Sequence, residues 1–160
     1  KRQIYGGGRV GLMGELAGAA LAAGGEVVGV IPRAMVDAER AHTGLTNLHI
    51  VTTMHERKAM MADLAEGFVA LPGGFGTLDE LFEIITWAQL ALHAKPVGIL
   101  NIEGFYDGLL SFLDGVVANG FIQPRFRALI LSDFDPARLL DRMAQHHPIP
   151  GGGFAREDVR

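Results

Sequence analysis

The chain has 160 residues, of which 49% are hydrophobic and 20% are charged, and it contains no cysteine. A chain of this length can form one domain with a full hydrophobic core, and the absence of cysteine excludes disulfides and thiolate metal sites. The net charge of −4 argues against a general nucleic-acid surface, which needs a basic patch. No apolar run approaches the roughly 20 residues of a membrane span and no signal peptide is visible. We therefore expect a cytoplasmic protein that binds neither nucleic acid nor membrane.

Short apolar runs alternate with helix-forming stretches along the chain. The runs predict six strands, over residues 3–5, 27–31, 48–51, 68–71, 97–100 and 129–131. Helices are predicted over residues 12–23, 53–66, 78–93, 106–118 and 136–145, with a helical turn near residues 36–40. This alternation is typical of an α/β protein whose parallel sheet has helices on both faces. We expect one such domain over residues 1–147, followed by a mobile tail over residues 148–160 that contains several glycines and prolines.

The first predicted strand leads into a glycine-rich turn. Gly6, Gly8 and Gly11 have the G-x-G-x-x-G spacing of a dinucleotide-binding loop between a strand and a helix. Such a turn can place backbone N–H groups against a phosphate, so Gly7 and Gly8 are phosphate-loop candidates. An NAD site also needs an acidic residue at the end of the next strand, where this chain has Arg33. Arg33 suits a 2′-phosphate instead, so an NADP-binding module is an alternative function.

The helix predicted over residues 53–66 carries two cations near its start. Thr53 and Glu56 have the spacing of a capping box. Arg57 lies in an apolar stripe, where an arginine extends towards solvent, pairs with a carboxylate or points into a cleft. Lys58 adds a second positive charge where the helix dipole disfavours cations, so a nearby anion would explain both residues. The apolar stripe is formed by Met54, Met61 and Leu64.

A second glycine-rich turn, with the sequence PGGFG over residues 72–76, follows the strand predicted over residues 68–71. Its backbone N–H groups, Gly73 among them, lie at the positive end of a helix dipole, where a phosphate can bind. Thr77 and Glu80 have the Thr-x-x-Glu spacing of another capping box, which predicts that the helix starts at Thr77. From spacing alone, Glu80 either caps its own helix or serves a cationic centre or a sugar hydroxyl.

The complete string PGGFGTLDE over residues 72–80 matches the PGGxGTxxE signature of the LOG family, the cytokinin-activating phosphoribohydrolases once described as lysine decarboxylases. YGGGRVGLMG over residues 5–14 and MHERK over residues 54–58 resemble the family's YGGGxxGLMG and MxxRK elements, and TWAQL over residues 86–90 continues the match. The resemblance covers about residues 4–121. It implies a modified Rossmann-like fold, a homodimer or larger assembly, and a nucleoside 5′-monophosphate ligand. Family members begin with a further strand, glycine-serine loop and helix, so the first βα unit is expected to be missing here.

The resemblance also implies roles for individual residues. Arg57 and Glu80 would be the catalytic pair that hydrolyses the N-glycosidic bond of AMP or N6-substituted AMP, without a metal or a cofactor. Glu39 would contact the substrate, although sequence alone favours a solvated loop charge there. The other implied substrate contacts are Lys58, Gly74, Phe75, Gly76, Thr77, Leu78, Asp79 and Thr86.

Three other functions are alternatives at this stage. A nucleotide or molybdenum-cofactor carrier would bind ligand without releasing base, and an NADP module would prefer NADPH to AMP. A lysine decarboxylase would need a pyridoxal phosphate lysine, and only Lys58 lies near the motifs.

The helix predicted over residues 78–93 is apolar nearly all round, because Phe82, Ile85, Trp87 and Leu90 spread over its surface. A helix without a polar face is buried on several sides. In a domain of this size, we expect one of those sides to meet another subunit. Thr86 is a polar exception, and its ordinary role would be a hydrogen bond back to its own helix.

Overall fold

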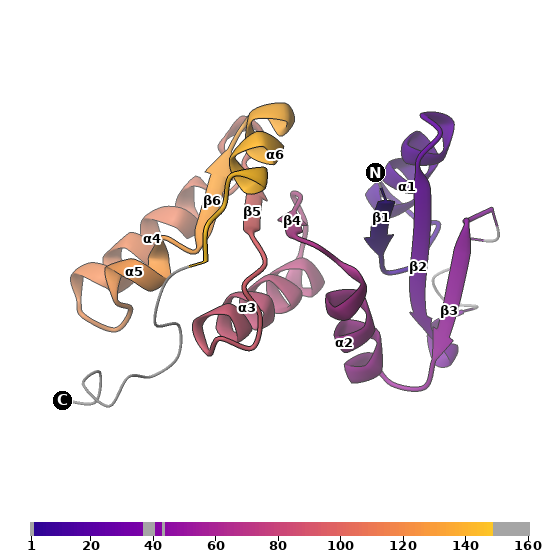
Figure 1. The fold of residues 1–160 in the computed structure, drawn as a ribbon, viewed down its shortest axis with the longest axis horizontal. Coiled ribbons are helices and arrows are strands. Elements are labelled where there is room, and N and C mark those ends of the chain that lie inside the picture. The colour runs from indigo at the N-terminus through magenta and orange to yellow at the C-terminus, as the bar shows by residue number, and fades with distance from the viewer. Residues whose placement is uncertain (1, 37–40, 43, 149–160) are drawn as a thin grey trace. The chain divides into compact units, whose positions relative to one another are not determined.

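A computed structural model describes residues 2–36, 41–42 and 44–148, and Figure 1 shows the order of its elements. The chain divides into two compact units, Lys1–Ala65 and Glu66–Arg160. All strand pairs among the named strands are parallel, which confirms the α/β fold class. The six strands form two three-stranded sheets, one in each unit. The single domain over residues 1–147 stays a prediction, and residues 149–160 of the expected tail lie outside the described residues.

The first unit is organised around one buried central strand, β2. Every residue of β2 after Glu26 is buried, and the strand pairs in parallel with β1 and β3. Ile4 of β1 lies opposite Val28, and Ile31 lies opposite Ile50 of β3. In order, the unit contains β1 (Arg2–Tyr5), α1 (Leu12–Ala22), β2 (Glu26–Pro32), a 3-10 helix (Arg33–Met35), β3 (Asn47–Val51) and α2 (Met54–Leu64).

The second unit repeats this plan with β5 as its central strand. Val97, Gly98 and Ile99 of β5 are buried, between β4 on one side and β6 on the other. Its elements are β4 (Phe68–Ala70), α3 (Phe75–Gln89), β5 (Val97–Leu100), a 3-10 helix (Ile102–Gly104), α4 (Asp107–Ala118), α5 (Pro124–Arg127), β6 (Ile130–Asp133) and α6 (Pro136–Ala144).

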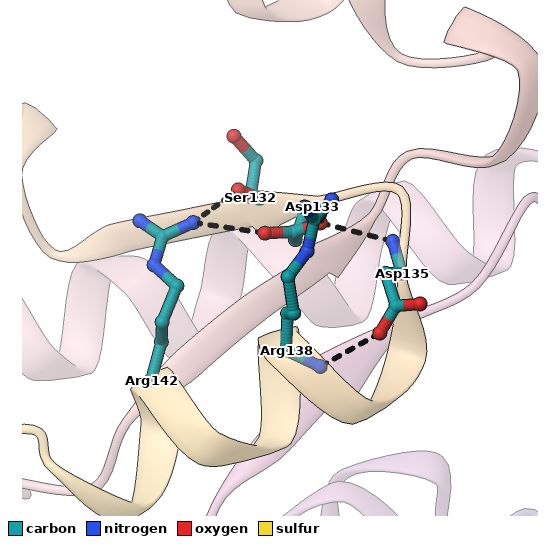
Figure 2. A network of polar contacts seen from close by, with 5 residues as sticks. All are labelled: Ser132, Asp133, Asp135, Arg138 and Arg142. Carbon is teal, nitrogen blue, oxygen red and sulfur yellow. Dashed lines mark hydrogen bonds and ion pairs between the residues drawn. The ribbon is translucent and has the colours of Figure 1, made fainter.

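A polar network fastens α6 to the end of β6 (Figure 2). Asp133 accepts hydrogen bonds from the backbone N of Asp135 at 2.9 Å and from Nη2 of Arg138 at 2.8 Å. Arg142 donates to the carbonyl oxygen of Ser132 at 2.6 Å, and Asp135 caps the helix by accepting from the backbone N of Arg138 at 2.8 Å. The Asp135 backbone N–H, with smaller contributions from Arg138 and Arg142, lowers the pKa of Asp133 below its ordinary 3.8.

Most predicted elements are confirmed to within a few residues, and the capping box of α2 is present. Thr53 Oγ1 accepts from the backbone N of Glu56 at 3.1 Å, and Glu56 accepts from the backbone N of Thr53 at 3.3 Å. The helical turn after β2 lies at Arg33–Met35, and residues 37–40 of its predicted range are outside the described residues. The short helix α5 was not predicted, because four residues are too few to show a period. Within the described part of the chain, no helix has the length and apolarity to cross a membrane.

The start of α3 differs from the prediction. The helix begins at Phe75 with Gly74 as its N-cap, and no side chain caps it. The prediction that Thr77 is the N-cap, with Glu80 completing a capping box, is therefore wrong. The reason is that Phe75 and Gly76 already belong to the helix, after Gly74 in an extended conformation, so the helix starts two residues earlier than the threonine.

Candidate functional site

The glycine turn of the first unit is packed directly against β2. The carbonyl oxygen of Gly7 accepts from the backbone N of His42 at 3.0 Å, and Gly8 forms an isolated antiparallel bridge with Ala41. Gly7 has φ of 76°, a left-handed conformation that suits glycine. A Cβ added at Gly29 of β2 would lie 2.8 Å from the Cα of Gly7. The turn is therefore held by hydrogen bonds on one side and packs closely against β2 on the other.

Arg57 is buried beside this turn, at the start of α2. Its side chain is 6% exposed, and Nη2 donates to the carbonyl oxygen of Gly6 at 3.2 Å. Nη1 lies 3.4 Å from the sulfur of Met54. Nε is buried and has no acceptor within residues 2–36, 41–42 and 44–148. A guanidinium has five N–H donors and buried polar groups are normally hydrogen-bonded, so Arg57 retains donor capacity for an anionic or oxygen-rich ligand.

The contact of Gly6 with Arg57 is a feature that the sequence analysis did not predict. A Cβ at position 6 would collide with Nη2 of Arg57 and would lie 2.9 Å from its Cζ. The guanidinium therefore occupies the space that any side chain at position 6 would fill. The sequence offered one signal that this position needs a glycine, because Gly6 is the first of three consecutive glycines after Tyr5.

In the second unit, the other glycine turn forms the start of α3. The first helical bond runs from the backbone N of Leu78 to the carbonyl oxygen of Gly74, at 3.1 Å. By helix geometry, the N–H groups of Phe75, Gly76 and Thr77 have no acceptor within the helix. The first turn of α3 contains no acidic residue. A Cβ at Gly73 would collide with Oγ1 of Thr77, so the turn and the helix are in close contact.

Glu80 lies in the second turn of α3 and is half-buried. It is the sixth residue after the N-cap, too far along the helix to bond the N-cap backbone as a capping box requires. The structure therefore removes the capping-box explanation for Glu80. Asp79, its neighbour, is exposed, and Leu78 is half-buried.

The remaining predicted site residues are distributed over both units. Thr86 donates from Oγ1 to the carbonyl oxygen of Phe82 at 2.7 Å, the ordinary bond back to its own helix. Lys58 is half-buried in the first unit, and Glu39 lies outside the described residues. Arg57 belongs to the first unit and Glu80 to the second. The structure thus brings Arg57 together with Gly6, and Gly73 with Thr77, while the pairing of Arg57 with Glu80 stays a prediction.

Comparison with known proteins assigns the chain to a family. A family model described as "Possible lysine decarboxylase" matches residues 13–143. A cytokinin riboside 5′-monophosphate phosphoribohydrolase of Rhodococcoides fascians is 52% identical over 139 residues, which are 85% of this chain and 70% of the relative. The chain belongs to the LOG family.

Plant members of the LOG family are similar to the chain over nearly its whole length. A probable cytokinin riboside 5′-monophosphate phosphoribohydrolase of Oryza sativa subsp. japonica is 49% identical over 146 residues, covering 91% of this chain and 64% of the relative. A cytokinin riboside 5′-monophosphate phosphoribohydrolase of Arabidopsis thaliana is 45% identical over 153 residues, covering 96% of this chain and 67% of the relative. The chain thus spans about two thirds of the length of these curated relatives, all three of which are named for hydrolysis and not for decarboxylation.

Proposed function

We propose that this LOG-family protein hydrolyses the N-glycosidic bond of AMP or N6-substituted AMP. Water adds at C1′ as the bond to the base nitrogen breaks, so the products are free base and ribose 5-phosphate. The names of relatives at 45–52% identity support this reaction. The structural observation that carries the proposal is the start of α3. The glycine turn there has no acidic residue, and the carboxylate of Glu80, which follows it, does not cap the helix.

The 5′-phosphate would bind at the first turn of α3. The N–H groups there and the helix dipole both favour an anion, and no acidic side chain of that turn repels it. The absence of Cβ atoms at Gly73, Gly74 and Gly76 would let the phosphate approach the backbone closely. Lys58 would add positive charge for a phosphate, and the buried glycines Gly7 and Gly8 of the first unit are further candidates for phosphate contacts.

Glu80 would stabilise the reacting sugar. Cleavage of a glycosidic bond builds positive charge on the ring in an oxocarbenium-like transition state, and a carboxylate can stabilise that charge and orient the attacking water. Glu80 lies five residues after Phe75, the first residue of α3, which is about 7.5 Å along a helix axis. A phosphate at the first turn and an anomeric carbon near Glu80 can therefore share one helix without the two negative charges meeting.

Arg57 would bind the substrate or assist departure of the base. Its side chain is held by Gly6 and still has a buried Nε without an acceptor in the described part of the chain. A planar guanidinium fits phosphate and other oxygen-rich groups through two parallel hydrogen bonds. Further substrate contacts would come from Phe75, Thr77, Leu78, Asp79 and Thr86. Glu39, which lies outside the described residues, would also contact the substrate.

The active species would be a cytoplasmic homodimer or larger assembly. On and beside α3, Phe75 is 93% exposed and Leu92 is 68% exposed, while Phe82 and Leu90 are each 38% exposed. An exposed apolar surface of this kind favours self-association about a two-fold axis.

Incubation of the full-length protein with AMP and with isopentenyl-AMP, followed by chromatography for free base, tests the proposal. Stoichiometric release of adenine or of N6-isopentenyladenine, with ribose 5-phosphate, is the expected result. Binding of either nucleotide without release of base would indicate a carrier, and preferential binding of NADPH would indicate the NADP module.

A further inference from the structure

One buried hydroxyl in the second unit contacts the backbone immediately before the glycine turn that leads into α3. The Tyr106 hydroxyl donates to the carbonyl oxygen of Leu71 at 2.6 Å, across 35 residues of chain. Tyr106 is 1% exposed. Burial raises its pKa above the ordinary 10.0, so the hydroxyl stays protonated and remains a donor at physiological pH.

Tyr106 is itself fixed by the turn that follows β5. Its backbone N donates to the side-chain oxygen of Asn101 at 2.7 Å, and the Asn101 amide donates to Asp107 at 2.7 Å. The backbone N of Asn101 donates to the carbonyl oxygen of Asp133 at 2.8 Å, which ties the turn to β6. The turn includes Glu103 with φ of 51°, a left-handed conformation that costs free energy in a non-glycine residue and often occurs near functional sites.

The sheet ladder ends just before the chain passes from β4 to α3. The ladder between β4 and β5 ends with Ala70 opposite Ile99, so the sheet does not fix Leu71. Pro72 has no N–H to donate, and the glycines at positions 73 and 74 have no side chains to pack. The bond from Tyr106 is therefore placed where the chain leaves the sheet and enters the turn.

We infer that Tyr106 is a positioning residue for the turn over residues 71–77. Its hydroxyl fixes the carbonyl of Leu71 and thereby the place of the N–H groups at the start of α3. The effect on catalysis rests on the proposed function, because that turn is where the 5′-phosphate would bind. A displacement of about 1 Å in such a group can cost as much as 10²-fold in rate.

The test compares Tyr106→Phe with Arg142→Met in the full-length protein. Tyr106→Phe removes only the hydroxyl and keeps the ring. Arg142→Met removes a side-chain-to-backbone bond of the same 2.6 Å length to Ser132 and an ion pair with Asp133 at 3.6 Å, both of which join α6 to β6 and not to the turn. Steady-state base release from AMP, hydrogen exchange of peptides covering residues 73–77, and the unfolding temperature are measured for both variants.

Tyr106→Phe is expected to lower kcat/KM at least about tenfold, to speed hydrogen exchange in residues 73–77, and to lower the unfolding temperature no more than the control does. A kcat/KM within twofold of the control variant would overturn the inference, whatever the exchange rates. A wild-type protein that releases no base would overturn the proposed function instead. In that case AMP affinity and hydrogen exchange are compared, and equal values in Tyr106→Phe and the control would overturn the role of Tyr106.

Discussion

The guanidinium of Arg57 lies against the backbone of Gly6, with Nη2 donating to the Gly6 carbonyl oxygen at 3.2 Å. The two residues are 51 positions apart in sequence. Arg57 needs an acceptor for a buried charge, and Gly6 must lack a side chain because the guanidinium occupies that space. The first glycine of the turn thus holds an arginine, while its successors Gly7 and Gly8 are the phosphate candidates.

Gly6→Ala tests this relationship, with Gly18→Ala as the matched control. The added methyl at position 6 would displace the guanidinium, and overpacking of this kind costs about 1–3 kcal/mol of the free energy of unfolding. Gly18 lies in α1 with no atom within 4 Å of an added Cβ, so the same change there should stabilise the helix by up to about 1 kcal/mol. Chemical unfolding and base-release assays on both variants give the comparison. Equal activity in the two variants would show that Gly6 has no special role.

Arg57→Ala should reduce turnover strongly, and Arg57→Lys should not restore it, because lysine lacks the planar set of donors. Arg33→Ala is the control, since Arg33 is an exposed arginine of the same unit. We expect base release by Arg33→Ala to be unchanged, as measured by chromatography under saturating AMP. If Arg57→Ala unfolds but keeps its specific activity per folded molecule, Arg57 is a structural partner of Gly6 alone. If Arg33→Ala is the variant that loses nucleotide binding, the NADP alternative gains support.

The sequence predicted the strands and most helices because apolar runs and capping residues are local signals. Thr53 and Glu56 cap α2 as their spacing indicated. The identical Thr-x-x-Glu spacing at Thr77 and Glu80 predicted the wrong start for α3. The helix starts at Phe75, and its N-cap, Gly74, has no side chain that a sequence pattern could reveal. The contact between Arg57 and Gly6 could not be predicted from a local sequence pattern either, because it joins residues that lie on different elements. Burial of Arg57 could be inferred from its apolar stripe, but its acceptor could not.

Acid should weaken the attachment of α6 to β6. The folded state lowers the pKa of Asp133, so its carboxylate contributes stability above the ordinary pKa of 3.8, and this contribution is lost as pH falls through the lower, folded-state pKa. Asp133→Asn cannot be protonated in this way, so its stability should fall less steeply than that of the wild type below pH 4. Urea unfolding between pH 3 and pH 7 measures the difference. Parallel curves for the two proteins would contradict the proposed contribution of Asp133.

Specific activity should fall on dilution, together with the mass measured by light scattering. Phe82→Glu is expected to favour the single subunit, because it places a charge on the apolar surface of α3. Phe121→Glu is the control, since Phe121 is 85% exposed and lies outside α3. A wild-type protein that is fully active at a concentration where its mass is that of one subunit would disprove the assembly proposal.

The central claim is that Glu80 acts on the substrate and does not cap α3, and one comparison tests it most directly. Glu80→Gln keeps the size of the side chain and removes its charge, while Glu83→Gln makes the same change one turn further along the same helix. Base release from AMP is measured by chromatography, and AMP binding and unfolding are measured on the same samples. We expect Glu80→Gln to lose base release by at least about 10²-fold, the scale of a positioned catalytic group. It should still bind AMP and should unfold within about 1 kcal/mol of the wild type, and Glu83→Gln should remain active. Turnover by Glu80→Gln at a rate near that of the wild type would contradict the account.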